Sequence, residues 1–320
     1  MKSSLTVLVA AIVGLFVIVG FEAKAQNLIP MVGNSNIQVQ VSGYTHVYYL
    51  PDSTTCPKAD RIGLPDDGSD SQWGLCRIRL SVKSSTPLGF FSEIEAVDID
   101  HSKENWLREA KISYKVNDDW SLYAGRIFIA SGWVTPSPAN IETVRYPRMP
   151  FTCYAYAVQA QGNLGEGISI ASDISGKSGV SFDSDENFDQ VESSTRLKKE
   201  ITKNLFLAGM VQMSRDFGGF VLDSEYRIDK LCLRGAGYTK YELTNKAKDT
   251  KGFYTFASYQ VLTGVELHTQ YDHQNGGNDI WTAGIRLWAP KDQISLTVDY
   301  EYVPRQNDDS RVVARAEVRF

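Results

Sequence analysis

Three basic side chains at alternate positions could bind oxyanions together. Within residues 75–83, Arg77, Arg79 and Lys83 alternate with small or apolar residues: Cys76, Ile78, Leu80 and Val82. The planar donors of a guanidinium group bind carboxylate and phosphate in a bidentate way. Because side chains two residues apart share one face of a strand, we expect the three cations to line the same polar face.

Further candidates for a selectivity role lie in later segments: Lys111, Arg126, Arg145, Arg148 and Arg234. Acidic residues on the expected polar faces are about as numerous, so two interpretations stay open. The charges either pair across neighbouring strands and hold the wall, as Arg79 would opposite Glu95, or they form a selectivity ladder. For Arg145 and Arg148 the alternative to a place at the pore is a solvated loop.

Patterns typical of catalysis are sparse. The chain has four His, and it lacks a Gly-x-Ser-x-Gly, a His-Glu-x-x-His and a glycine-rich phosphate loop. We therefore expect no enzyme, no cofactor and no metal site. A net charge of -5 gives no basic footprint for a nucleic-acid partner.

The four cysteines are too far apart in sequence for a zinc site. Export would place them in an oxidising compartment, where a disulfide can form. We favour a pair between Cys56 and Cys153, and we expect Cys76 and Cys232 to pack as small apolar residues.

The amino terminus has the pattern of an export signal. Lys2 precedes an apolar run over 5–19, and Ala23-Lys24-Ala25 supplies small residues at alternate positions. The run is short for a membrane anchor. We expect a signal peptide over 1–25 and a short periplasmic segment over 26–36.

Beyond residue 36 the chain alternates with a period of two, which is typical of strands with one apolar and one polar face. We expect strands near 37–50, 75–83, 90–100, 106–116, 120–129, 154–161, 168–175, 190–201, 205–214, 220–228, 231–242, 253–261, 264–271, 280–288, 294–303 and 311–320. Connections after even-numbered strands are brief, whereas the three longest follow odd-numbered ones, at 51–74, 130–153 and 176–189. This parity favours an all-β, 16-stranded antiparallel transmembrane β-barrel over 37–320, of the outer-membrane porin type, rather than a soluble sandwich.

Two details of the strands carry further expectations. The last segment alternates to the final residue, Phe320, which resembles the signal by which the barrel assembly machinery recognises outer-membrane barrels. In 120–129 we prefer the register that turns Arg126 inward, because an arginine in hydrocarbon costs about 2–4 kcal/mol near the midplane. That register sends the other parity outward: Tyr123, Gly125, Ile127 and Ile129.

Four consecutive segments, RIRL (77–80), FSEIE (91–95), LREAKISY (107–114) and LYAGRIF (122–128), carry a family likeness. In order and character they resemble the phosphate-selective porin O and P family, over roughly the first third of the chain. The resemblance implies a sixteen-stranded porin that forms a homotrimer. It also implies that the third outer loop, here 130–153, folds inward to narrow the pore.

We therefore expect a porin in the cell outer membrane: a water-filled channel through which small hydrophilic solutes, including anions such as phosphate, diffuse passively. Its partners would be outer-membrane lipid, the barrel assembly machinery and the solutes themselves. The alternative is a non-conducting barrel whose extracellular loops, such as 51–74 with its acidic residues, bind a partner or surface. A third interpretation is an outer-membrane barrel hydrolase.

Overall fold

The computed structural model describes residues 37–49, 71–84, 88–96, 107–129, 154–176, 191–243, 249–277, 279–289, 294–304 and 309–319. As far as Glu109 it describes the backbone alone. Every element in these ranges is a β-strand, and every paired neighbour is antiparallel. The prediction of an all-β antiparallel fold is confirmed.

The strands follow one another along the chain with these bounds: β1 Ile37–Tyr49, β2 Ser71–Ser84, β3 Leu88–Ala96, β4 Leu107–Lys115, β5 Trp120–Phe128, β6 Tyr154–Gly165, β7 Ile168–Gly176, β8 Val191–Thr202, β9 Leu205–Ser214, β10 Phe217–Ile228, β11 Leu231–Glu242, β12 Thr250–Leu262, β13 Val265–Gln274, β14 Ile280–Trp288, β15 Ile294–Val303 and β16 Asp309–Arg319. Among the described residues, no helix is long and apolar enough to cross a membrane.

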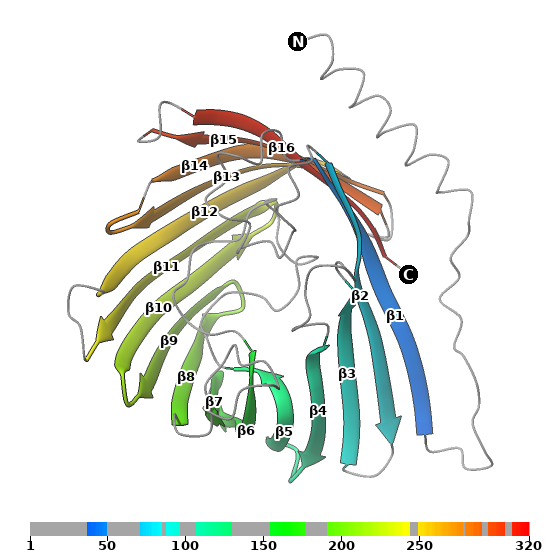
Figure 1. Cartoon of the computed structure of the whole chain (residues 1–320), viewed down its shortest axis with the longest axis vertical. Helices are drawn as coiled ribbons and strands as arrows, with labels where there is room; N and C mark the ends of the chain where they lie inside the picture. The colour runs from blue at the N-terminus through cyan, green and yellow to red at the C-terminus, as the bar shows by residue number, and fades with distance from the viewer. Residues whose placement is uncertain are drawn as a thin grey trace.

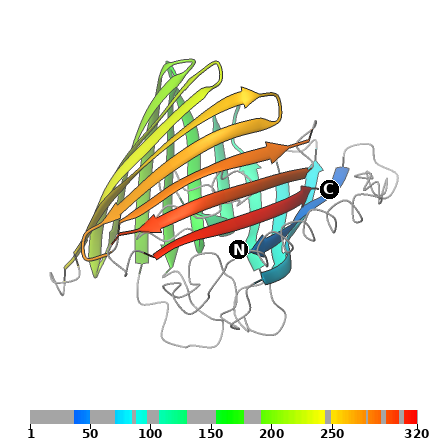
Figure 2. The same cartoon turned by 90° about the horizontal axis from the view of Figure 1, so that it is seen from above.

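The sheet is a meander that closes on itself. Each strand pairs with its neighbours in sequence, and β16 also pairs with β1, from Tyr44 opposite Arg319 to Tyr49 opposite Ala314. Figure 1 shows the strands arranged around a central space, with the C-terminus beside β1. In the view from above, hairpin turns join neighbouring tilted strands at both ends of the barrel (Figure 2). Closure leaves no sheet edge with unpaired backbone groups.

The connections at one end of the barrel are tight. Only two residues separate β6 from β7, β8 from β9, β10 from β11 and β12 from β13. At the β6–β7 turn Glu166 and Gly167 both have positive φ, 50° and 72°. Positive φ at both central residues is the geometry that lets a two-residue hairpin follow the twist of its strands.

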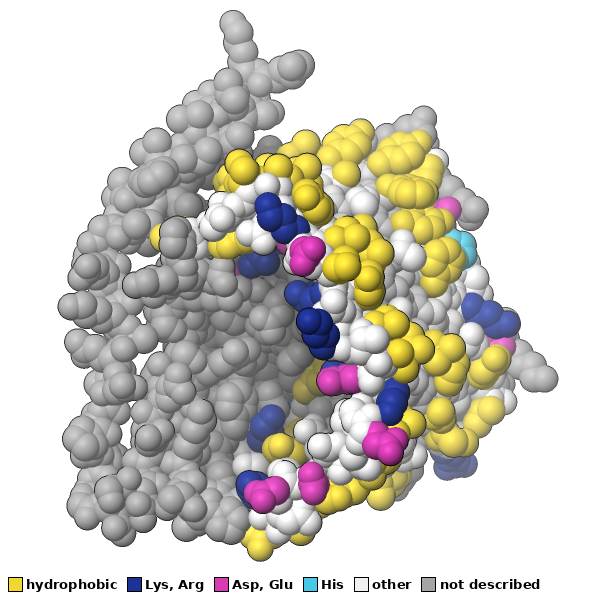
Figure 3. Space-filling model, turned by 180° about the vertical axis from the view of Figure 1, so that it is seen from behind, with side chains coloured by type: hydrophobic (Ala, Val, Ile, Leu, Met, Phe, Trp, Pro, Cys, Tyr) yellow, Lys and Arg dark blue, Asp and Glu magenta, His cyan; other side chains and the backbone are white. Residues whose placement is uncertain are grey.

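The two faces of the barrel wall have the reverse of the usual distribution. On β7 the side chain of Ile174 is 64% exposed, whereas that of its neighbour Asp173 is 2% exposed. Other strands repeat this pattern, with exposed Val158, Leu207 and Leu222 on the outer face. Figure 3 shows apolar side chains over the outer surface, and basic and acidic ones along the border of the hollow. Where side chains are described, the face that carries the buried polar residues therefore forms the inner wall.

Candidate functional site

The inner wall of the barrel is the candidate site, because strand alternation brings its polar side chains together there. Across β6, β7 and β8 the register aligns Gln159, Asp173 and Ser194. Ser194 Oγ donates to Asp173 Oδ2 at 2.7 Å, and Gln159 Nε2 donates to the same oxygen at 3.4 Å. These buried groups are hydrogen-bonded to one another in a row that crosses the strands.

Ion pairs connect the next strands of the wall. The Arg196 guanidinium contacts Asp223 Oδ1 at 2.6 Å from β8 to β10. Glu225 accepts from Arg227 at 2.5 Å and from Arg234 at 2.7 Å, and the Arg234 side chain is only 4% exposed. The two guanidinium groups give this half-buried carboxylate charge-assisted hydrogen bonds in place of those to water.

Over β8 to β11 the inner face carries five basic residues and five acidic ones. The basic residues are Arg196, Lys198, Arg227, Arg234 and Lys240. The acidic residues are Glu192, Glu200, Asp223, Glu225 and Glu242. Positive and negative charges are equally numerous on this part of the wall. The same side chains can therefore either pair across strands or form a selectivity ladder.

Cations also lie over aromatic rings of the inner wall. The Lys198 ammonium is 4.7 Å from the Phe206 ring centre, and the Lys240 ammonium is 4.3 Å from that of Phe217. Arg234 lies 5.2 Å from the ring centre of Phe256. Ring faces attract cations, so these contacts hold the long side chains against the wall rather than across the lumen.

A histidine and an aspartate meet on the far side of the barrel. His268 Nε2 and Asp299 Oδ1 are 2.6 Å apart, and both side chains are fully buried. They belong to β13 and β15, with Gly284 of β14 between them in the register. A Cβ at Gly284 would come within 2.6 Å of His268 Nε2 and closer still to Asp299 Oδ1, so only glycine leaves room for this contact.

Two predicted site residues lie on the inner face. Lys111 pairs with Gly125 of β5, and its ammonium is 5.3 Å from the ring centre of Tyr123. Arg234 is buried in its pair with Glu225. The structure therefore puts both on the wall, and their role in selectivity stays a prediction.

The register predicted for Arg126 is wrong. Arg126 shares the face of exposed Leu122 and pairs with Tyr156, which is also exposed, so it points outward. Its guanidinium is 5.9 Å from the Tyr156 ring centre. The opposite parity faces inward, where Ile127 and Ile129 are buried against small side chains, Ala155 and Ala157. Packing on the inner face decided the register, although the sequence argument placed those isoleucines in lipid.

The remaining predicted residues fall where side chains are not described. Arg77, Arg79 and Lys83 lie in β2, and the backbone register sets Arg79 opposite Glu93, not Glu95 as predicted. Arg145, Arg148 and Phe320 lie outside the described residues.

Of the cysteines, Cys232 is buried on the inner face of β11. Cys76 lies in β2 without a described side chain, and the predicted pair Cys56 and Cys153 lies outside the described residues.

The sequence argument missed the His268–Asp299 contact as a unit. Both residues have inward parity, but the contact joins strands that are not neighbours. The signal that could have found it is the small Gly284 on the strand between them.

The comparisons with known proteins bear on the fold. No protein-family model matches the sequence, and no curated protein is similar to it. Solved structures do match. The outer membrane channel DcaP of Acinetobacter baumannii shares 12% identity and a TM-score of 0.62, with 92% of this chain and 100% of that chain covered.

Two further solved structures have the same fold. Salmonella typhi OmpF, in complex with daunomycin, shares 14% identity and a TM-score of 0.62 over 90% of this chain and 99% of that one. An anion-selective porin from Comamonas acidovorans shares 13% identity and a TM-score of 0.60 over 89% and 100%. The described strands therefore have the same barrel fold as these outer-membrane channels.

Proposed function

We propose that this chain is an outer-membrane porin, a sixteen-stranded barrel exported with residues 1–25 as its signal peptide. It forms a water-filled channel through which small hydrophilic solutes, including anions such as phosphate, diffuse down their gradients. The proposal includes the surrounding outer-membrane lipid, the barrel assembly machinery and two further copies of the chain as partners.

The observation that carries the proposal is the reversed distribution of side chains. Leaving a large aliphatic side chain in water forgoes about 1.5–3 kcal/mol, and the outer face of the described strands carries many such side chains. Their sum would exceed the few kcal/mol of net stability that a domain has. Lipid chains remove this penalty, and a closed sheet is one of the two structures that satisfy every backbone group in lipid.

An enzymatic role is not part of the proposal. Ser258, His268 and Asp299 fall in one row across β12 to β15, the residue types of a hydrolytic triad. However, His268 and Asp299 are fully buried, so a substrate has no access to them. Among the described residues, no group of three or more His, Cys, Asp or Glu is arranged to hold a metal ion.

One observation favours the second candidate, a barrel that does not conduct. Along β15 and β16 the inner side chains Asp299, Glu301, Arg315 and Glu317 are buried, so water does not reach that part of the wall. On the opposite side Arg196 and Lys198 remain 20% and 30% exposed. We place the water path along β5 to β8 for this reason.

Planar-bilayer recording separates the two candidates. The mature chain, refolded in detergent and checked by the shift of its band before and after boiling, should give discrete current steps when added to the bilayer. A protein with the folded band and no current steps would refute the channel and favour the non-conducting barrel.

Reversal potential in a salt gradient tests the anion preference. Replacing Arg145 and Arg148 together by Gln should move the reversal potential toward cation preference, because fixed charge at a constriction sets the sign of selectivity. The Lys240→Gln variant, which removes one cation of the β11 wall, is the control. An unchanged potential in the double variant would discard these two residues as determinants of selectivity.

A further inference from the structure

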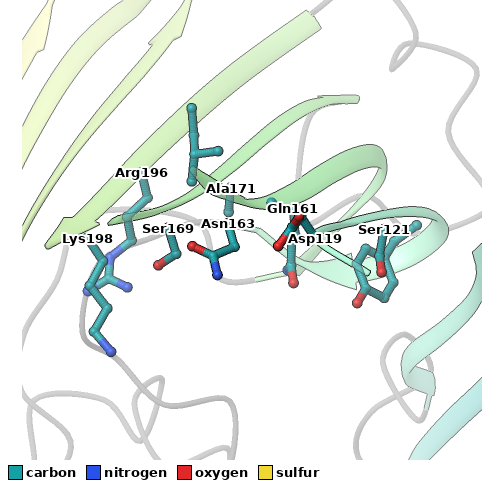
Figure 4. Close-up of a pocket in the computed structure, with 11 residues that line it drawn as sticks. Asp119, Ser121, Gln161, Asn163, Ser169, Ala171, Arg196 and Lys198 are labelled. Carbon is teal, nitrogen blue, oxygen red and sulfur yellow. The ribbon is translucent and has the colours of Figure 1, made fainter. Parts of the chain in front are cut away.

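A cavity of about 440 Å³ opens on the inner wall near the short turns, over β5 to β8. Its shape follows from the register. Ala171 and Ser169 of β7 form the floor, because each is opposite a longer side chain on both neighbouring strands. We call this cavity the β7 trough; it is defined by the residues labelled in Figure 4.

The two walls of the β7 trough differ in chemistry. Arg196 and Lys198 rise from β8 on one side, while Gln161 and Asn163 rise from β6 on the other. The walls are two strand spacings apart, about 9.6 Å. Figure 4 shows the cations at one end of the row and Asp119 and Ser121 at the other.

The neighbouring row of inner side chains, Gln159, Asp173 and Ser194, borders the trough. Asp173 is already bonded to Ser194 and Gln159, so these polar groups turn toward one another rather than toward the cavity. By contrast, the Lys198 side chain stays 30% exposed beyond its 3.0 Å contact with Glu200, and the Arg196 side chain stays 20% exposed beyond its contact with Asp223. The trough thus combines two partly exposed cations at one end with amide, hydroxyl and carboxylate groups at the other.

That combination matches one class of solute. A carboxylate on the solute would meet the Arg196 and Lys198 donors, as oxyanions meet guanidinium and ammonium groups. Several hydroxyls would bond to Gln161, Asn163 and Ser169, which both donate and accept. Asp119 accepts hydrogen bonds from hydroxyl groups but repels a carboxylate, which fixes the orientation of the solute.

We propose that the β7 trough is a binding site for a sugar acid, a polyhydroxylated monocarboxylate that passes through the barrel. The volume lies within the range of ordinary small-ligand sites. This inference rests on the proposed channel function and adds the class of solute that the channel retains on its path.

The test measures the binding of solutes to the protein and, in a separate experiment, the ion current through the channel. Galacturonate, uncharged galactose and inorganic phosphate are titrated into the refolded mature chain, with saturation-transfer NMR for binding and bilayer recording for interruption of the current. Galacturonate should bind and interrupt the current at lower concentration than either of the other two.

The chain offers a closely matched pair of variants. Lys198 and Lys240 each contact a glutamate two residues further on, at 3.0 and 3.1 Å, and each lies over a phenylalanine ring. Lys198→Gln should weaken galacturonate binding about tenfold, the order expected for a hydrogen bond to a charged group. Lys240→Gln, outside the trough, should leave binding unchanged.

A second variant keeps the charged residues of the trough and fills its volume. Ala171→Leu fills the floor of the trough and should abolish binding in a protein that still shows the folded band. The sugar-acid site would be overturned if galactose or phosphate bound as tightly as galacturonate, or if neither Lys198→Gln nor Ala171→Leu weakened galacturonate binding. Current steps without galacturonate binding would overturn the site alone, and galacturonate binding without current steps would overturn the channel alone. The absence of both current steps and binding would overturn both proposals.

Discussion

Replacing Gly284 by Ala should destabilise the barrel through the His268–Asp299 contact. An alanine Cβ would lie 2.6 Å from His268 Nε2 and also 2.6 Å from the backbone oxygen of Val298, where real Cβ contacts begin at about 3.0 Å. The backbone oxygen is fixed in the β14–β15 ladder, so the two side chains must retreat. Their 2.6 Å contact then lengthens toward the limit of a hydrogen bond.

The cost follows from burial. Both side chains are fully buried, and leaving a buried polar group without its hydrogen bond costs about 1–3 kcal/mol. Because the contact is displaced rather than deleted, we expect a loss of about 2 kcal/mol in the free energy of unfolding. That loss corresponds to roughly thirtyfold in the unfolding equilibrium.

Urea unfolding of the refolded protein, followed by tryptophan fluorescence, measures this loss. Gly237→Ala is the matched control, since nothing lies within 4 Å of a Cβ at that strand glycine. In an Asp299→Ala background the Gly284→Ala substitution should cost less than in the unmodified protein, because the obstructing carboxylate is gone, but still more than the control, because the Val298 backbone oxygen remains. Equal stability of Gly284→Ala and Gly237→Ala, or full additivity in the double variant, would refute the reasoning.

Two other predictions concern single charges. Arg126→Leu should raise the free energy of unfolding in lipid vesicles by about 2 kcal/mol, because the outward arginine beside Tyr156 faces hydrocarbon; a loss of stability in denaturant titration would contradict this. In the β4–β5 turn, the hydrogen bond and charge of Lys115 lower the pKa of Asp118. Its contribution to stability is therefore present above the ordinary carboxyl range and lost as pH falls through the lowered pKa. NMR titration should show this lowered pKa, and Lys115→Gln should return it to the ordinary range; an unshifted Asp118 in the unmodified protein would rule the interaction out.

Strand positions were readable from the sequence because alternation is a local property. The segments predicted at 205–214, 231–242, 280–288 and 294–303 coincide with β9, β11, β14 and β15. In β15 the alternation is nearly strict, with Ile294, Leu296 and Val298 of one parity and Ser295, Thr297 and Asp299 of the other, so no tertiary information was needed there.

The ends of strands were harder to predict from the sequence where a glycine within a strand suggested a turn. The run 162–167 suggested a connection, yet β6 continues to Gly165 and the turn is Glu166–Gly167. Gly162 stays in the strand because the Trp120 ring covers it from β5, leaving no space for a Cβ. An aromatic ring on the neighbouring strand thus compensates for the missing side chain, which a propensity argument along one strand does not detect.

Registers between strands were the least readable feature, and β5 shows why. Both of its faces carry apolar residues, so alternation alone permits either one to meet lipid. The cost of Arg126 in hydrocarbon favoured the inward register, but that argument counted one side chain. The observed register buries Ile127 and Ile129 on the inner wall and places Leu122 and Phe128 with Arg126 on the outer one. Because a strand turns as a unit, the packing of several residues outweighs the position of one charge, and Arg126 is then accommodated against Tyr156.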